Sequence, residues 1–384
     1  MLNVAGMISR LSLYCLIGVL FACANEESKV ERKIEEGTEV VINHLKPYKI
    51  KGEVYGFNLE EEMVISQERK DLIDLGLMSM GEFAVDSDGN IYIVGWKNTN
   101  DFIFKFDRNG NFRASFGRRG QGPGELQMPT WPGILDDKIY ITDRGKKIVI
   151  YDKNGKWLEE KSFMVRASEG DILSNGKYLL FGGVEGYKTE VYVPYTLSIY
   201  DSSFRKVKSL DTYKLHYRDE RLAPFFMWRV TKNYIFIINE ERGYEILIYD
   251  HEGNFVRKIR KKYKPVAASK EIKMMIMGPQ YTETGPRSEY VPDPLPPIRF
   301  FEADDGNRLF VMTYEKGRKP GEFMYDIFNT DGVYVGRQSL NLRWADLYFG
   351  VKYQAIKNNK LYFYRENENG YMELVVSKIK WLYR

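Results

Sequence analysis

One short pattern recurs six times along the chain at a nearly constant spacing. It is a polar residue followed by a strand-like run of β-branched and aromatic residues, as in Asn90-Ile-Tyr-Ile-Val94. The six copies begin at Asn90, Lys138, Lys177, Asn233, Arg308 and Lys360. From Ile91 to Leu361 the pattern spans 270 residues in five intervals, a mean of 54. A fixed period of this length predicts a repeat architecture.

A second marker runs in register with the first. Turns of four residues, with Asp or Asn first and Gly last, follow apolar runs at 107–110, 152–155, 250–253 and 329–332, and a degenerate copy lies at 201–204. The first residue accepts hydrogen bonds from the backbone, and Gly supplies the positive φ that closes the hairpin. Each repeat is therefore expected to hold four short antiparallel strands. This favours a propeller over a large sandwich or two barrels.

The predicted fold is all-β: a six-bladed β-propeller of four-stranded antiparallel blades. The expected blade limits are about 78–117, 129–165, 167–211, 225–263, 297–341 and 346–384. The last unit offers only three strands, so residues of about 50–66 are expected to supply its outer strand and close the ring. Residues 48–384 would then form one domain.

A proline-rich insertion at 264–297 interrupts the repeat. It holds half of the 14 prolines in the chain, and its segment 271–277 is expected to form one or two helical turns. Both a lid or partner-binding surface and a padded connection are consistent with this insertion.

The N-terminus carries an export signal. Residues 11–22 form an uncharged apolar run after Arg10, too short for a membrane span and the right size for a secretion signal. The run ends in Leu20-Phe21-Ala22-Cys23, which resembles the lipobox of bacterial lipoproteins. The resemblance implies a signal peptide over 1–22, lipidation of Cys23, and an exported protein on the periplasmic or surface face of an outer membrane. Since Cys15 lies within the signal, no disulfide is expected. Residues 23–47 are interpreted as a solvated tether, with a short helix over 28–36 as the alternative.

A glycine-rich string connects the first two units. It reads Phe116-Gly-Arg-Arg-Gly-Gln-Gly-Pro-Gly-Glu-Leu126 and resembles the linker between blades of NHL- or TolB-like propellers, most closely the six-bladed propeller lipoproteins of Bacteroidetes. The likeness covers about 48–384 and is strongest over 83–163. The string lacks the GKS or GKT ending of a phosphate-binding loop and lies between strands, so we interpret it as a crossover. Arg118 and Arg119 at its tip are candidate contacts for an acidic ligand.

Charge and histidine content disfavour several function classes. Lys and Arg total 57 against 53 Asp and Glu, and this near-balance does not indicate nucleic-acid binding. The one basic cluster, at 257–262, is interpreted as a solvated edge strand. No two of the three histidines, His44, His216 and His251, lie at ligand spacing, and His251 is expected in an exposed turn. No metal, cofactor or catalytic residue is therefore assigned.

Propellers place functional groups near the central channel, at the ends of their first strands. Repeat position selects Glu82, Arg229, Glu302 and Lys352 as candidates. Because no ring of acidic residues occupies these positions, we expect a monomeric, non-catalytic scaffold that binds a protein, peptide or glycan. The alternative, which six-bladed relatives suggest, is a metal-dependent enzyme of lyase or lactonase type with its site at the channel. Trp96, Trp131 and Trp228 are candidates either for stacking on sugars or for core packing.

Overall fold

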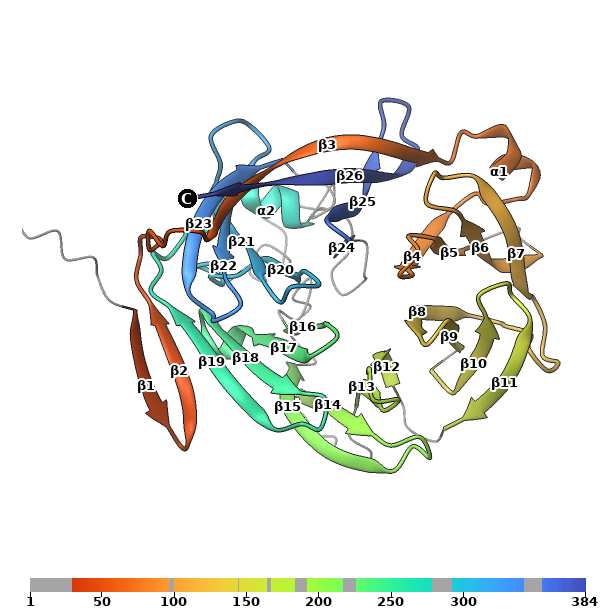
Figure 1. Ribbon diagram of the computed structural model, residues 1–384, viewed down its shortest axis with the longest axis horizontal. Helices are drawn as coiled ribbons and strands as arrows, with labels where there is room; N and C mark the ends of the chain where they lie inside the picture. Colours follow the sequence, from red (N-terminus) through yellow and green to blue (C-terminus); the bar gives the residue numbers. More distant parts are fainter. Residues whose placement is uncertain are drawn as a thin grey trace, which may run out of the picture.

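A ring of six sheets, each built on four antiparallel strands, surrounds a central axis (Figure 1). The computed structural model describes residues 30–96, 100–143, 145–163, 167–183, 192–216, 226–277, 292–341 and 354–384. Each sheet starts near the axis and steps outward strand by strand. The predicted six-bladed β-propeller is confirmed.

The blades follow one another in chain order, and their strands are given from the centre outward. Blade one holds β4 (Met80–Val85), β5 (Ile91–Gly95), β6 (Asp101–Phe106) and β7 (Phe112–Arg118). Blade two holds β8 (Pro129–Leu135), β9 (Lys138–Asp143), β10 (Lys147–Asp152) and β11 (Trp157–Ser162). Blade three holds β12 (Ala167–Ile172), β13 (Tyr178–Gly183), β14 (Tyr192–Tyr200) and β15 (Lys206–His216). Blade four holds β16 (Phe226–Val230), β17 (Tyr234–Asn239), β18 (Glu245–Asp250) and β19 (Phe255–Lys261). Blade five holds β20 (Phe300–Ala303), β21 (Leu309–Lys316), β22 (Phe323–Phe328) and β23 (Tyr334–Leu340).

Blade six joins the two ends of the domain. Its inner strands are β24 (Gln354–Lys357), β25 (Lys360–Glu366) and β26 (Met372–Tyr383), and its outer strand is β3 (Val54–Ser66) from the N-terminal side. β3 pairs antiparallel with β26 from Ser66↔Glu373 to Val54↔Tyr383. The N-terminal strand therefore closes the ring, as the sequence predicted.

Residues 30–53, here called the N-terminal strap, correct the prediction of a solvated tether reaching to residue 47. They form a hairpin of β1 (Glu31–Glu35) and β2 (Thr38–Asn43), closed at Glu36 and Gly37 with φ of 50° and 79°. β2 pairs in parallel with β19 and extends blade four to six strands. The prediction of a tether is wrong for this segment because the Val-rich β2 pairs with the outer edge of β19. This pairing leaves Val40 and Val41 fully buried.

The strap also corrects the interpretation of the basic cluster at 257–262 as a solvated edge. Glu39 accepts from Arg257 at 2.6 Å, and Glu35 accepts from Arg260 at 2.6 Å. Hydrogen bonds from Arg260 and then Lys33 lower the pKa of Glu35 to about 2. The cluster is thus a covered strand whose arginines are paired with strap glutamates.

The Asp turns have the predicted geometry and a further role between blades. Asp107 Oδ1 accepts from the N–H groups of Asn109 at 2.9 Å and Asn111 at 3.0 Å. Turns that begin at Asp86, Asp152, Asp201, Asp250, Asn329 and Asn367 repeat this arrangement. In blade two, a Cβ on Gly155 would lie 2.5 Å from Phe116 Cδ1 of blade one. This glycine therefore supplies both the positive φ and the close approach of neighbouring blades.

The hydrophobic core is divided among the blade interfaces. In the described part of the chain, six clusters of buried residues each lie between one pair of adjacent blades. The cluster between blades four and five includes Phe236, Ile246, Phe301, Val311 and Tyr334. Packing between blades therefore holds the ring together.

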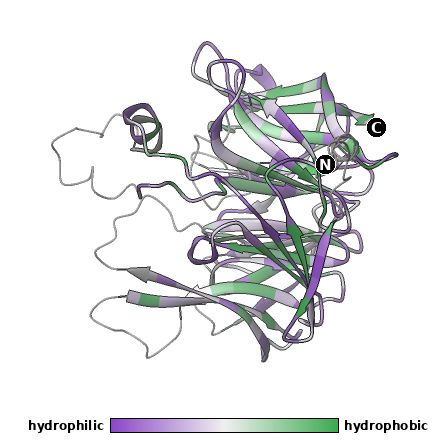
Figure 2. Cartoon of the chain, turned by 90° about the vertical axis from the view of Figure 1, so that its left-hand side faces the viewer, coloured by the Kyte–Doolittle hydropathy of each residue, from purple (hydrophilic) through white to green (hydrophobic). Residues whose placement is uncertain are grey.

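Three short helices complete the described structure. They are α1 (Lys70–Asp74), the 3₁₀ helix η1 (Glu240–Arg242) and α2 (Lys270–Met277). α2 forms where the insertion was expected to make helical turns, and it projects from one face of the ring (Figure 2). Residues 278–291 of the insertion lie outside the described residues. None of the helices in the described ranges is long and apolar enough to cross a membrane.

Candidate functional site at the mouth of the central channel

A cavity of about 510 Å³ opens at one mouth of the central channel. All six blades line it, with the ends of β4, β8, β12, β16, β20 and β24 and the turns that follow them. Aliphatic side chains form much of the wall, namely Val85, Ile134, Leu135, Ile172, Val230 and Ile356. The volume lies within the range of about 300–1,000 Å³ that is typical of small-ligand sites.

Strand register identifies one equivalent position in each blade at this mouth. The residue in question pairs with the third residue of the repeated strand pattern in five blades and with the fourth in blade four: Ala84↔Tyr92, Gly133↔Tyr140, Asp171↔Leu179, Arg229↔Phe236, Glu302↔Phe310 and Ala355↔Tyr362. All six line the cavity. The mouth is therefore asymmetric, with charged residues in blades three to five and small residues in blades six, one and two.

The structure brings together two of the residues selected from the sequence. Arg229 Nε donates to Glu302 Oε2 at 3.0 Å, and these two side chains are only 12% and 7% exposed. Arg229 also donates to the carbonyl of Trp228 at 2.8 Å, and its guanidinium lies 4.7 Å from the ring centroid of Phe300. The pair links blades four and five in the wall of the cavity.

Glu82 has a different place. It is buried, and its Oε2 accepts from the backbone N–H of Trp131 at 2.5 Å. The innermost strand of a blade has a free edge whose backbone groups need partners when buried. Glu82 therefore ties blade one to the edge of blade two and does not line the cavity.

Two further selected residues, Arg118 and Arg119, are not among those that line the mouth. Arg118 is the exposed last residue of β7 and Arg119 is exposed directly after it, with its guanidinium 4.5 Å from the ring centroid of Phe102. Cys23 and Lys352 lie outside the described residues.

The acidic residues at the mouth are engaged by protein groups. Asp171 accepts from Trp228 Nε1 at 2.8 Å, and Asp304 accepts from Arg308 Nε at 2.7 Å. Burial raises the pKa of Asp304 and the Arg308 interactions oppose this shift. Asp305 accepts from the backbone N–H of Asn358 at 2.7 Å.

Gln354 and Lys232 line the cavity and were missed by the sequence reasoning. Gln354 is 6% exposed, and its buried Oε1 has no hydrogen-bond partner among the described residues. In blade six the sequence reasoning selected Lys352, which is two residues before Gln354 in the chain. Blade six turns with only Asn358 and Asn359, both at positive φ of 54° and 58°, where blade one uses a longer Asp turn. An alignment of the repeats that allowed for this shorter turn would have selected a residue of β24 instead of Lys352.

The structure corrects the expectation for His251 and decides between the two interpretations of the tryptophans. His251 is buried at 7% exposure: its Nδ1 accepts from the N–H of Ser174 at 3.2 Å and lies 2.7 Å from Ser174 Oγ. Its turn packs on blade three, and burial lowers its pKa. Trp131 and Trp228 are also buried, which favours their core-packing interpretation over sugar stacking, and Trp96 is half-buried against the core between blades one and two.

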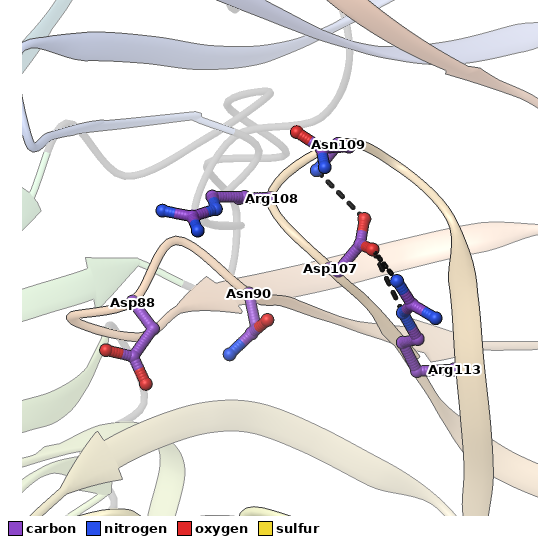
Figure 3. Close-up of a pocket in the computed structure, with 6 residues that line it drawn as sticks. All are labelled: Asp88, Asn90, Asp107, Arg108, Asn109 and Arg113. Carbon is purple, nitrogen blue, oxygen red and sulfur yellow. Dashed lines mark hydrogen bonds and ion pairs between the residues drawn. The ribbon is translucent and has the colours of Figure 1, made fainter.

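A second depression lies on blade one, where Asp88, Asn90, Asp107, Arg108, Asn109 and Arg113 surround about 440 Å³ (Figure 3). Asp107 serves its own turn and forms an ion pair with Arg113. Burial opposes ionisation of Asp107, but hydrogen bonds led by those of Asn111 lower its pKa. Within the described ranges no group of three or more His, Cys, Asp or Glu residues is placed to hold a metal ion.

Comparisons with known proteins support this architecture. The model of a family described as a 6-bladed beta-propeller, DUF5128, matches residues 82–218. A crystal structure of a candidate exported protein from Bacteroides fragilis is 14% identical, has a TM-score of 0.53, and covers 89% of this chain and 99% of its own. A member of the DUF4221 family from Bacteroides vulgatus is 12% identical, has a TM-score of 0.50, and covers 87% of this chain and 100% of its own. No curated protein matches in sequence. The chain is thus a six-bladed β-propeller, similar in fold to these proteins of Bacteroides.

Proposed function

We propose that the chain is a non-catalytic binding module whose ligand enters the mouth of the central channel. The observation that carries the proposal is the cavity of about 510 Å³ to which all six blades contribute. Its wall belongs to the first strands of a closed ring, so the site is largely formed before a ligand arrives. A rigid, preformed site loses little conformational entropy on binding.

The chemistry of the wall supports binding over catalysis. General acid–base work needs a titratable group that can reach the substrate. Here Arg229 and Glu302 are engaged with each other, and Asp171 and Asp304 with Trp228 and Arg308. These groups give the mouth a fixed pattern of charge that can discriminate among ligands.

We further propose that the chain is an exported lipoprotein of the NHL- or TolB-like kind, anchored at Cys23 and acting as a monomer. The lipobox resemblance supports the anchor, and the description of the B. fragilis protein as a candidate exported protein supports export. The strap begins at Val30, and six residues separate it from Cys23. A fully extended chain spans at most about 3.5 Å per residue, so the module would lie within roughly 25 Å of the lipid.

A ligand screen with a blocking variant tests the binding proposal. Ser87 is exposed at the rim of the cavity, so Ser87→Trp should obstruct the mouth and leave the ring folded. Ser203→Trp, in an exposed turn of blade three, is the matched control. We expect peptides or oligosaccharides that raise the melting temperature of the wild type and of Ser203→Trp, but not of Ser87→Trp, with the shift unchanged by EDTA. Metal-dependent turnover of a lactone or polysaccharide, or shifts unaffected by Ser87→Trp, would contradict the proposal.

A further inference from the structure

We propose that the channel mouth recognises the carboxylate of a peptide, supplied by an acidic side chain or by a chain terminus. This inference rests on the proposed binding function and names the ligand class for the same cavity. It follows from the charges that remain available at the mouth, from one buried amide, and from the nature of the walls.

Seven charged side chains line the cavity, but most are already engaged. The acids are Asp171, Glu302, Asp304 and Asp305, and the bases are Arg229, Lys232 and Lys357. Each acid accepts a hydrogen bond from a protein donor. Arg229 is paired with Glu302. Lys232 and Lys357 are therefore the groups of the wall with N–H donors left to meet an anionic ligand.

Neither lysine has a carboxylate partner in the described part of the chain. Lys232 is exposed in the turn after β16, and its side chain makes no hydrogen bond or ion pair with described residues. Lys357 donates to the carbonyl of Val85 at 2.7 Å, which leaves its charge uncompensated by an acid. An ammonium donates three hydrogen bonds, so Lys357 can still bind an anion. A ligand carboxylate would complement both lysines.

Gln354 supplies an acceptor for a donor of the same ligand. A buried amide oxygen without a partner costs roughly the desolvation energy of the group, so natural proteins keep few of them. Rotation about the terminal torsion, which has broad minima, would exchange the positions of Oε1 and Nε2 and could present Oε1 to a ligand in the cavity that Gln354 lines. A main-chain N–H of a bound peptide is a suitable donor.

The walls favour a peptide over an acidic sugar. Phe83 is the one aromatic side chain among the residues that line the cavity, and it is 4% exposed. Trp131 and Trp228 are buried in the core, so neither offers a face for a sugar ring. The aliphatic side chains around the mouth instead suit the alkyl parts of amino-acid side chains.

Calorimetric titration with defined probes tests the proposal. The probes are a blocked hexapeptide of alternating alanine and glutamate, its blocked glutamine counterpart, the glutamine peptide with a free C-terminus, and trigalacturonate. The variants are Lys232→Glu and Gln354→Met. Lys156→Glu is the control because Lys156 is an exposed lysine in a turn of blade two.

We expect the glutamate peptide, the free-terminus peptide or both to bind, and the blocked glutamine peptide to bind at least tenfold more weakly. Lys232→Glu should weaken binding by roughly tenfold or more, as expected for loss of a charge-assisted contact, whereas Lys156→Glu should not. Which peptide binds distinguishes a side-chain carboxylate from a terminal one. Equal binding of all peptides, or equal effects of Lys232→Glu and Lys156→Glu, would overturn the inference.

Gln354→Met provides a readout that a purely structural role would not give. Since it removes an unpartnered buried oxygen, it should raise the melting temperature of the free protein and weaken peptide binding by roughly tenfold. Lower stability with unchanged binding would count against the role of Gln354 and hence against the site. If only trigalacturonate binds, or no probe binds, the peptide inference fails while the proposed function is judged separately by its Ser87→Trp screen.

Discussion

Replacing Gly155 with alanine should cost more stability than the same change at Gly370, although both glycines close the same type of turn. Their φ angles are 88° and 81°, so the backbone strain of an alanine is nearly equal, at roughly 1–2 kcal/mol. At Gly155 the new Cβ would lie 2.5 Å from Phe116 Cδ1 and 2.9 Å from Phe116 Cβ. At Gly370 the nearest atom is Glu366 Oε1 at 3.6 Å, which is ordinary contact.

The difference between the two variants isolates the contact between blades. Overpacking typically costs about 1–3 kcal/mol, because buried neighbours must leave their rotamers. Phe116 is a rigid neighbour, since it is 8% exposed and its ring lies 5.1 Å from that of Tyr151. We therefore expect Gly155→Ala to lower the free energy of unfolding by about 2–5 kcal/mol and Gly370→Ala by about 1–2 kcal/mol. Replacing glycine with alanine also reduces the conformational entropy of the unfolded chain. This effect is the same for both variants and cancels in the difference between their free energies of unfolding.

Urea denaturation followed by tryptophan fluorescence measures both losses. A double-mutant cycle with Phe116→Leu supplies the control, because a smaller side chain should reduce the cost of Gly155→Ala and leave that of Gly370→Ala unchanged. Equal losses for the two glycine variants would refute the reasoning that turn glycines are required for blade packing.

Three further predictions concern the strap, a histidine and the anchor. Deleting residues 30–43 should lower the melting temperature yet leave a cooperative ring, whereas deleting 48–70 removes β3 and should abolish cooperative unfolding by circular dichroism; equal effects would contradict the distinct roles of strap and closing strand. Because burial lowers the pKa of His251, the unfolded chain takes up a proton at a higher pH than the folded chain does. The free energy of unfolding should therefore be unaffected by this group above about pH 6.5 and should decrease as the pH falls toward the folded-state pKa. His251→Asn keeps an acceptor for the Ser174 N–H and cannot titrate, so its stability should fall less between pH 7 and 5; an identical pH dependence by urea denaturation would refute this. Cys23→Ala should abolish incorporation of labelled palmitate and release the protein from membranes, and continued labelling would exclude Cys23 as the anchor.

Local signals made the blades predictable. The repeated strand pattern and the Asp turns depend on residues close in sequence, and the four strands of blades one to five are joined by hairpins between sequence neighbours. Closure by β3 was also predictable, because the sixth repeat has only three strands of its own. In contrast, the strap could not be recognised as structure. β1 is mostly exposed and charged, and the partner of β2 is β19, more than 200 residues away.

The site was predictable only in part. Arg229 and Glu302 were selected by repeat position, but their pairing depends on the approach of neighbouring blades. Glu82 was selected two residues before Ala84, the position on β4 that lines the mouth. A β-bulge in β4 and the short Asn358-Asn359 turn of blade six both shift the register relative to the repeat. Whether a buried polar side chain such as Gln354 finds a hydrogen-bond partner depends on tertiary contacts, which the spacing of residues in the sequence does not reveal.

Hydrogen–deuterium exchange tests the central claim, that ligand binding occurs at the channel mouth, most directly. The full chain would be compared free and with a saturating concentration of the glutamate hexapeptide. We predict protection of backbone amides in residues 83–87, 229–232 and 354–358, three segments from three blades that supply residues of the cavity wall. Protection confined to the crossover at 117–126 or to the outer strands would contradict the account.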